Sequence, residues 1–204
     1  MAGARPTFHL LAGPNGAGKT SLYEAVIRRL TDAEFVNPDR LCFAELGRHA
    51  LSRADAELGQ RLAETRRGEL MAASRSLVVE TTFSHPSKLD LLRRARVLGY
   101  ELVVYHLSLG SADEAVARVA QRAGAGGHPV PEANIRGRFA RNPALIREAI
   151  LLADFGHVFD NSVLGRAPRR VIAFVGGRPA LVAPDLPVWA RELYGRDLGP
   201  RTLA

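Results

Sequence analysis

The sequence predicts an α/β protein in which a mostly parallel five-stranded sheet lies between two layers of helices, as a three-layer sandwich. Short apolar runs bounded by turn residues alternate along the chain with longer segments whose apolar residues recur at helical spacing. Strands that alternate with helices form parallel sheets covered on both faces. A glycine-rich segment also stands directly between the first apolar run and the first helical segment.

Each element follows from its own segment of this pattern. The five predicted strands cover residues 7–12, 34–36, 76–79, 101–107 and 156–160. The predicted helices cover residues 21–30, 40–50, 54–73, 86–98, 112–121, 131–152 and 186–194, with a break expected near Asn142-Pro143. Gly176 and Gly177 predict a small C-terminal hairpin over residues 170–182. Because no linker or repeat interrupts the pattern, we expect residues 1–204 to form one domain.

Composition narrows the classes of function. The chain has 204 residues, 47% of them hydrophobic and 24% charged, as in ordinary globular proteins. No apolar run reaches the roughly 20 residues of a membrane span, and no secretory signal is visible, so we expect a cytoplasmic protein. Cys42 is the only cysteine, which excludes an internal disulfide, and we expect it to be buried. The net charge of +7 favours anionic ligands, but the basic residues are too scattered for a nucleic-acid interface.

Residues 13–20 carry the strongest functional signal. They match the pattern G-x-x-x-x-G-K-[ST] and lie between a predicted strand and a predicted helix, which is the context that a phosphate-binding loop requires. Lys19 is expected to reach the β- and γ-phosphates of ATP, and the Thr20 hydroxyl to hold Mg²⁺. The predicted ATP-binding residues are Gly13, Pro14, Asn15, Gly16, Ala17, Gly18, Lys19, Thr20 and Ser21. The sandwich is therefore predicted to be of the P-loop kinase-like kind.

The same glycine loop also occurs in transporter-type ATPases, which carry a segment of the kind L-S-G-G-Q downstream. No such segment follows the loop in this sequence. We therefore expect a phosphotransferase that moves the γ-phosphoryl group of ATP to a hydroxyl group. An enzyme of this kind often uses a carboxylate to take the proton of the acceptor hydroxyl.

Two carboxylates are candidates for the acceptor side. Asp39 and Glu80 follow predicted strands, so both are expected at the sheet edge that carries the glycine loop. Asp39 is the candidate general base, although the local sequence supports equally well a role as cap of the helix that follows. Glu80 is expected near the metal or the acceptor. Thr81 and Thr82 are predicted either to donate their hydroxyl groups to the acceptor or to cap a turn.

A glycine-rich loop over residues 123–131 is predicted to form a lid. Arginines flank it in pairs that share a helical face, Arg118 with Arg122 and Arg138 with Arg141. Arginines on a closing lid neutralise charge on the transferring phosphoryl group. The alternative is a solvated basic face, which we expect for some of these residues and for Arg147. His128 lies in the loop and is expected to anchor the lid.

With these segments in this order, the chain resembles the zeta toxin family of P-loop kinases, and in particular its short stand-alone members. The matching segments are LLAGPNGAGKTSL, FVNPD, LVVETTFS, GYELVVYHLSL, RVAQRAGAGGHPVPEANIRGRF and FDNS, which together span Leu10 to Ser162. The toxin branch of the family resembles nucleotide kinases in fold and uses ATP to phosphorylate a hydroxyl of UDP-N-acetylglucosamine. The resemblance implies this acceptor or a related nucleotide sugar, and an antitoxin protein as a candidate partner.

The resemblance also implies roles for single residues. Lys19 and Thr20 match the phosphate-loop lysine and the Mg²⁺-binding hydroxyl. Asp39 matches the family's proposed general base, which favours that role over helix capping. Glu80 and Thr81 match the segment that contacts the sugar.

The lid departs from the family's pattern. Arg118 or Arg122 matches the first lid arginine, but His128 stands where the toxin branch has a second arginine. Arg136 and Arg138 are the candidates to replace it, and both are predicted to contact substrate. Because of this departure, a kinase for another small hydroxyl compound, such as an antibiotic, an aminocyclitol or a nucleoside, remains an alternative. A nucleotide-dependent switch without an acceptor is the alternative outside enzymes.

Overall fold

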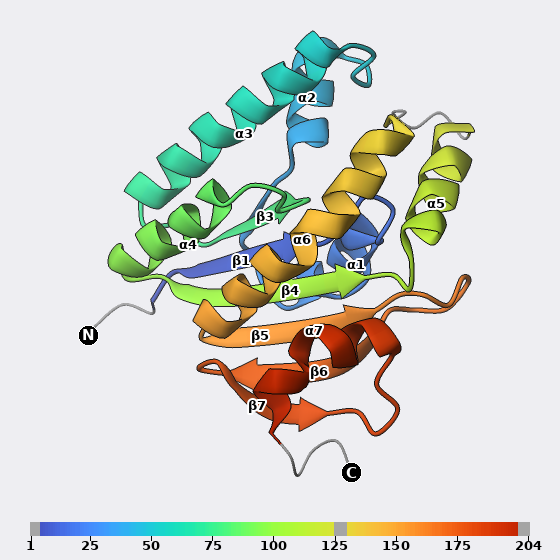
Figure 1. The fold of residues 1–204 in the computed structure, drawn as a ribbon. Helices are drawn as coiled ribbons and strands as arrows, with labels where there is room; N and C mark the ends of the chain where they lie inside the picture. The colour runs from blue at the N-terminus through green and yellow to red at the C-terminus, as the bar shows by residue number, and fades with distance from the viewer. Residues whose placement is uncertain (1–4, 125–129, 200–204) are drawn as a thin grey trace.

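A seven-stranded sheet in the order β2-β3-β1-β4-β5-β6-β7 forms the centre of the computed structural model, which describes residues 5–124 and 130–199 (Figure 1). Five neighbouring strands are parallel, and they lie close to the predicted positions. They are β1 (Thr7–Ala12), β2 (Glu34–Val36), β3 (Leu77–Thr81), β4 (Glu101–Ser108) and β5 (Phe155–Asp160). The predicted α/β class is confirmed.

The C-terminal hairpin belongs to the sheet, so the prediction of a five-stranded sheet was wrong in strand number. Strand β6 (Arg169–Val175) pairs antiparallel with β5, and β7 (Arg178–Val182) pairs antiparallel with β6. Without β6, the outer edge of β5 would present a row of unpaired N–H and C=O groups. The pairing also places Ile172 next to Val158, and both side chains are fully buried.

Two layers of helices cover the sheet. The layer facing the viewer in Figure 1 consists of α3 (Arg53–Ala72), α4 (Ser87–Val97), α6 (Glu132–Leu152) and α7 (Val188–Leu198). On the opposite face lie α1 (Lys19–Ala25), the 3₁₀ helix η1 (Ile27–Arg29) and α5 (Ala112–Gly124). No helix of the described residues is long and apolar enough to cross a membrane.

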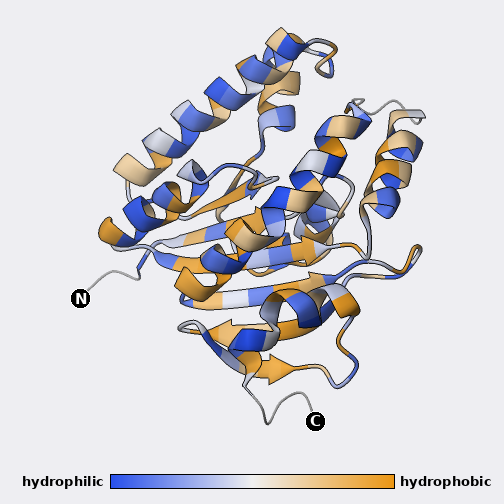
Figure 2. Ribbon diagram, viewed as in Figure 1, coloured by the Kyte–Doolittle hydropathy of each residue, from blue (hydrophilic) through white to orange (hydrophobic). Residues whose placement is uncertain are grey.

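The central strand β1 is buried on both faces. Phe8 and Leu10 pack into the apolar layer under α4 and α6, whereas Leu11 packs under α1 on the other face. A strand that is covered on both sides needs a nearly continuous apolar sequence, as β1 has. Figure 2 shows hydrophobic residues along the strands, while many hydrophilic residues lie along the outer helix α3.

Helix α6 contains Pro143 and nevertheless runs without interruption, so the break predicted near Asn142-Pro143 is absent. The cost of the missing backbone N–H is offset by packing and by one polar contact. Ile146 and Ile150 are fully buried against the sheet, and the buried Asn142 donates a hydrogen bond from Nδ2 to the carbonyl oxygen of Thr82.

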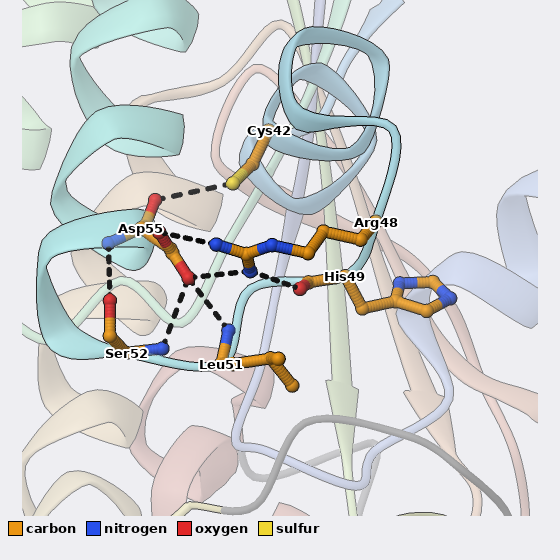
Figure 3. A network of polar contacts seen from close by, with 6 residues as sticks. All are labelled: Cys42, Arg48, His49, Leu51, Ser52 and Asp55. Carbon is orange, nitrogen blue, oxygen red and sulfur yellow. Dashed lines mark hydrogen bonds and ion pairs between the residues drawn. The ribbon is translucent and has the colours of Figure 1, made fainter.

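A compact polar network fixes the corner between α2 (Pro38–Leu46) and α3 (Figure 3). Ser52 and Asp55 form a capping box at the start of α3, and the Asp55 Oδ2 atom also accepts hydrogen bonds from Arg48 and from the backbone N–H of Leu51, both at 2.9 Å. These two hydrogen bonds hold the pKa of Asp55 well below its usual range, and the bond from Arg48 has the larger effect. Cys42 is buried as predicted and donates from Sγ to the Asp55 carbonyl oxygen at 3.3 Å. The network thus sets the direction of α2 relative to α3.

Candidate active site

The glycine loop follows β1 and curls around the start of α1. A Cβ atom on Gly13 would lie 2.1 Å from the carbonyl oxygen of Leu107, so the end of β4 passes too close for any other residue. Gly18 has a φ of 88°, and a Cβ atom there would lie 2.7 Å from the Asn161 side-chain nitrogen. The loop therefore has the tight geometry in which backbone N–H groups can converge on phosphate oxygens.

Lys19 is buried at the base of this loop, with 7% of its surface exposed. Its Nζ atom donates hydrogen bonds to the carbonyl oxygens of Gly13 and Pro14, both at 3.0 Å. An ammonium group has three N–H donors, so one remains for a ligand. The loop thus holds the Lys19 side chain in the position from which it is predicted to bind phosphate.

Four further charged side chains act on the Lys19 ammonium. Burial lowers the pKa of Lys19, and this is the largest effect; the Glu80 carboxylate raises the pKa, Arg122 lowers it, Asp39 raises it and Arg138 lowers it. Glu80, Arg122, Asp39 and Arg138 belong to β3, α5, α2 and α6, and Lys19 itself to α1. The structure therefore brings together, at the carboxyl edge of the parallel strands, five candidate residues that are scattered over 120 positions of the sequence.

Glu80 joins the glycine loop to the start of α2. Its Oε2 atom accepts a hydrogen bond from Thr20 Oγ1 at 2.8 Å and another from Asn37 Nδ2 at 3.0 Å. The Oδ1 atom of the same Asn37 accepts from the backbone N–H of Arg40 at 3.0 Å and so caps α2. Asn37 has no role in the sequence-based prediction, although its place in the Asn-Pro-Asp segment was a usable signal.

Asp39 lies in the first turn of α2 and is exposed. It does not cap this helix, because Asn37 does, so the capping alternative for Asp39 is wrong. A carboxylate in the first turn of a helix is favoured by the helix dipole. The charge of the Asp39 carboxylate also raises the pKa of Lys19.

Thr81 and Thr82 end β3 in a tight turn. Thr81 Oγ1 accepts a hydrogen bond from the backbone N–H of Phe83 at 3.0 Å, which is the predicted turn-capping role. Phe83 has a φ of 53°, a left-handed conformation that is uncommon for a bulky residue. Thr82 Oγ1 lies 3.4 Å from Ser84 Oγ. The Thr81 hydroxyl, which accepts in this turn, retains a proton that it can donate to a ligand.

The predicted lid arginines separate into two groups. Arg122 and Arg138 both lower the pKa of Lys19 by their charge, and Arg138 also donates to Asn15 Oδ1 in the glycine loop at 3.2 Å. Arg136 instead forms surface ion pairs with Asp113 and Glu132 at 2.7 and 2.8 Å. The two candidates for the second lid arginine are thus placed differently, and only Arg138 contacts the glycine loop. Two other predicted residues lie elsewhere: Arg147 is paired with Asp197 at 2.7 Å, and His128 lies outside the described residues.

The glycine loop is supported from behind by the segment that follows β5. Asn161 Nδ2 donates to the carbonyl oxygen of Ala17 at 2.9 Å, and the Asn161 backbone N–H donates to the carbonyl oxygen of Ser108, also at 2.9 Å. Arg118 donates from Nη2 to the carbonyl oxygen of Asn161 at 2.7 Å, so this arginine holds the supporting segment. The sequence-based prediction does not include Asn161, although the FDNS segment contains it.

The oxygens present at this edge fit a magnesium ion. Thr20 Oγ1 and Glu80 Oε2 are oxygen donors 2.8 Å apart, and Mg²⁺ in kinases is usually held by one or two protein oxygens together with substrate phosphates. Within residues 5–124 and 130–199, this edge included, no group of three His, Cys, Asp or Glu side chains is placed to hold a metal.

Several solved structures share this fold. A chain of the AvrRxo1-ORF1:AvrRxo1-ORF2 complex determined with ATP has a TM-score of 0.68 and 20% identity, over 98% of this chain and 65% of that one. The PezAT toxin-antitoxin system of Streptococcus pneumoniae gives a TM-score of 0.59 and 14% identity, over 83% and 72%. Shikimate kinase from Acinetobacter baumannii in complex with shikimate gives 0.50 and 22%, over 79% and 86%.

These similarities are at the level of the fold, which is α/β and P-loop kinase-like. The chain spans 65% of the AvrRxo1 complex chain that it matches. No curated protein matches it. Residues 8–141, more than half of the sequence, match the profile of the AAA domain family AAA_33. The chain therefore belongs to this AAA domain family.

Proposed function

We propose that this protein is a kinase that transfers the γ-phosphoryl group of ATP to a hydroxyl of UDP-N-acetylglucosamine or a related nucleotide sugar. One observation carries the reaction type. The buried Lys19 ammonium lies in the field of two carboxylates, Glu80 and Asp39, and of two guanidinium groups, Arg122 and Arg138. An acid–base group beside a phosphate cradle, with cations from elements that flank the lid, is the arrangement that phosphoryl transfer needs.

In this proposal the glycine loop binds the nucleotide. Backbone N–H groups of the glycine loop, in which Pro14 has none, bind the β- and γ-phosphate oxygens, and Lys19 adds its remaining donor. Thr20 would hold Mg²⁺, which neutralises charge on the same oxygens when it is bound. Glu80 keeps the Thr20 hydroxyl in place through their 2.8 Å hydrogen bond.

Asp39 is the proposed general base. It takes the proton of the acceptor hydroxyl as the hydroxyl oxygen forms its bond to the γ-phosphorus, while the bond from that phosphorus to the β,γ-bridging oxygen breaks and ADP leaves. Arg122 and Arg138 balance the negative charge on the group in transfer. The Thr81 hydroxyl retains a proton that can orient the acceptor, and Thr82 is the second candidate for this role.

The acceptor is proposed from the zeta toxin resemblance alone, and the PezAT toxin-antitoxin system shares the fold. The same reasoning makes an antitoxin protein a candidate partner, in a cytoplasmic protein that forms one domain. The lid differs from the toxin branch at His128, so a direct assay has to identify the acceptor.

The test is a transfer assay with γ-labelled ATP and a panel of acceptors: UDP-N-acetylglucosamine, UDP-glucose, an aminocyclitol, an aminoglycoside and a nucleoside. We expect label on the nucleotide sugars, and we expect the Asp39→Ala variant to lose it. If only another compound of the panel becomes labelled, that compound is the acceptor and the nucleotide sugar is not. ATP hydrolysis without label on any acceptor, unchanged in Asp39→Ala, would favour a nucleotide-dependent switch instead.

A further inference from the structure

Helix α3 places an arginine where its neighbours are apolar or small. The side of α3 that faces the sheet carries Gly59, Ala63, Leu70 and Met71, all of them buried. Arg67 lies on the same side and is 9% exposed. A cation on the inner face of an amphipathic helix loses most of its hydration, which is costly unless another group replaces the water.

Arg67 has no such group among the residues that the structure describes. Its nearest ionic partner is Glu64, whose Oε1 atom lies 3.8 Å from Arg67 Nη2, too far for a hydrogen bond. Burial lowers the pKa of Arg67, and Glu64 offsets this in part. None of its five N–H donors bonds to the described chain, and none of its nitrogen atoms is sealed from solvent, so the donors open toward water.

The guanidinium lines a cleft of about 280 Å³ between α3 and α4. Lys88, one of only two lysines in the chain, and Arg94 line the same cleft from α4. The pKa of Lys88 is lowered by burial first and by Arg67 second, while Glu64 raises it. The cleft therefore gathers three cations against one carboxylate, and two of the cations are partly or largely desolvated.

Both helices that line this cleft are joined, at other positions along them, to elements of the proposed acceptor side. Helix α3 packs against the start of α2, where Asp39 lies, so closely that a Cβ atom on Gly59 would be 2.6 Å from the Pro38 carbonyl oxygen. Helix α4 follows β3, which ends at Glu80 and Thr81. The cleft is distinct from the ATP cradle, because none of the residues that line it belongs to the glycine loop or to α1.

We propose that the cleft between α3 and α4 is an oxyanion site that binds the diphosphate of the phosphoryl acceptor through Arg67 and Lys88. The identity of the anion rests on the proposed function, since a nucleotide sugar carries a diphosphate at a distance from its sugar hydroxyls. Diphosphate oxygens supply the acceptors that the Arg67 donors lack, and a planar guanidinium binds two such oxygens side by side.

The test is calorimetric titration of the full chain with UDP, and with uridine as the ligand that lacks the diphosphate. A non-hydrolysable ATP analogue with Mg²⁺ is present at saturation, so that the glycine loop is filled. Arg67→Met keeps the length of the side chain but removes the charge and the donors. The matched control is Arg61→Met, which removes an exposed cation from the same helix.

We expect Arg67→Met to weaken UDP binding about tenfold or more, because charge-assisted hydrogen bonds are lost. Uridine and the ATP analogue should bind as before, and Arg61→Met should leave all three affinities unchanged. The melting temperature of Arg67→Met should not fall, since a largely buried charge is replaced by an apolar chain of similar length. Unchanged UDP binding in Arg67→Met, or a fall in melting temperature without any loss of UDP affinity, would overturn the proposal.

The transfer assay separates this inference from the proposed function. Arg67-dependent UDP binding without any phosphoryl transfer would leave the oxyanion site standing and remove the proposed reaction. Normal transfer to UDP-N-acetylglucosamine by Arg67→Met, with an unchanged KM, would leave the reaction standing and remove the site.

Discussion

Asn37 offers a sharp test of how the candidate site is held together. The side chain is 6% exposed and makes two hydrogen bonds, one that caps α2 and one that reaches Glu80. Replacing it by alanine removes both. Loss of the cap costs about 1 kcal/mol, and loss of a hydrogen bond to a carboxylate costs at least about 1.5 kcal/mol. Because Glu80 keeps its bond to Thr20, we take the lower value and expect about 2.5 kcal/mol in total.

The Asn37→Asp variant separates these two contributions. Aspartate also caps helices well, so the first turn of α2 should be preserved. The new carboxylate, however, would face Glu80 at the position where Asn37 Nδ2 now lies 3.0 Å from Oε2. Two carboxylates about 4 Å apart repel each other by up to about 4 kcal/mol at an effective dielectric constant near 20. Protonation of one of them relieves this repulsion, so the loss of stability should be larger at about pH 8 than at about pH 5.

Urea denaturation at both pH values measures these effects, with wild type and Asn134→Ala, an exposed position on α6, as controls. The free energy of unfolding should fall by about 2.5 kcal/mol in Asn37→Ala at both pH values. In Asn37→Asp the free energy of unfolding should fall mainly at the higher pH. A change of less than about 0.5 kcal/mol in Asn37→Ala, the usual range for surface substitutions, would refute the connection between α2 and Glu80.

Three further predictions concern the glycine loop and the core. Lys19→Ala should abolish phosphoryl transfer to any acceptor while the far-ultraviolet circular dichroism spectrum stays unchanged; retained transfer would contradict the mechanism. Gly13→Ala should lower the free energy of unfolding by about 2–3 kcal/mol and prevent ATP binding, since its Cβ would lie 2.1 Å from the Leu107 oxygen. Burial lowers the pKa of His106 to about 3, so the folded protein resists protonating it. Its contribution to stability is present above pH 6.5 and is lost as the pH falls toward 3; His106→Gln should flatten this decrease in urea denaturation.

Much of the fold could be predicted because its signals are local. Each parallel strand is a short apolar run, and the glycine loop has a spacing that few other structures need. The place of the hairpin could not be predicted in this way, because its pairing with β5 depends on two segments that only the folded sheet brings together. The continuity of α6 past Pro143 likewise depends on packing, which outweighs the local preference for a break.

The candidate site was predictable to a similar degree. Lys19, Asp39 and Glu80 could be placed at one edge, because the ends of parallel strands meet there. The roles of the lid arginines could not be divided from sequence, since Arg136 and Arg138 differ in their partners and not in their local pattern. Arg67 was missed for a related reason: in a helix rich in charged residues, only the fold shows which one faces inward.

The contact between Asn161 and Ala17 bears on the order in which this protein can mature. Ala17 is synthesised 144 residues before the side chain that supports its carbonyl oxygen. During translation the glycine loop therefore leaves the ribosome long before β5 exists to bring Asn161 behind it. A nascent chain that ends after β4 holds every residue of the phosphate-binding motif and still lacks this support. Competence to hold a nucleotide firmly should thus arise late in synthesis, when the sheet is nearly complete.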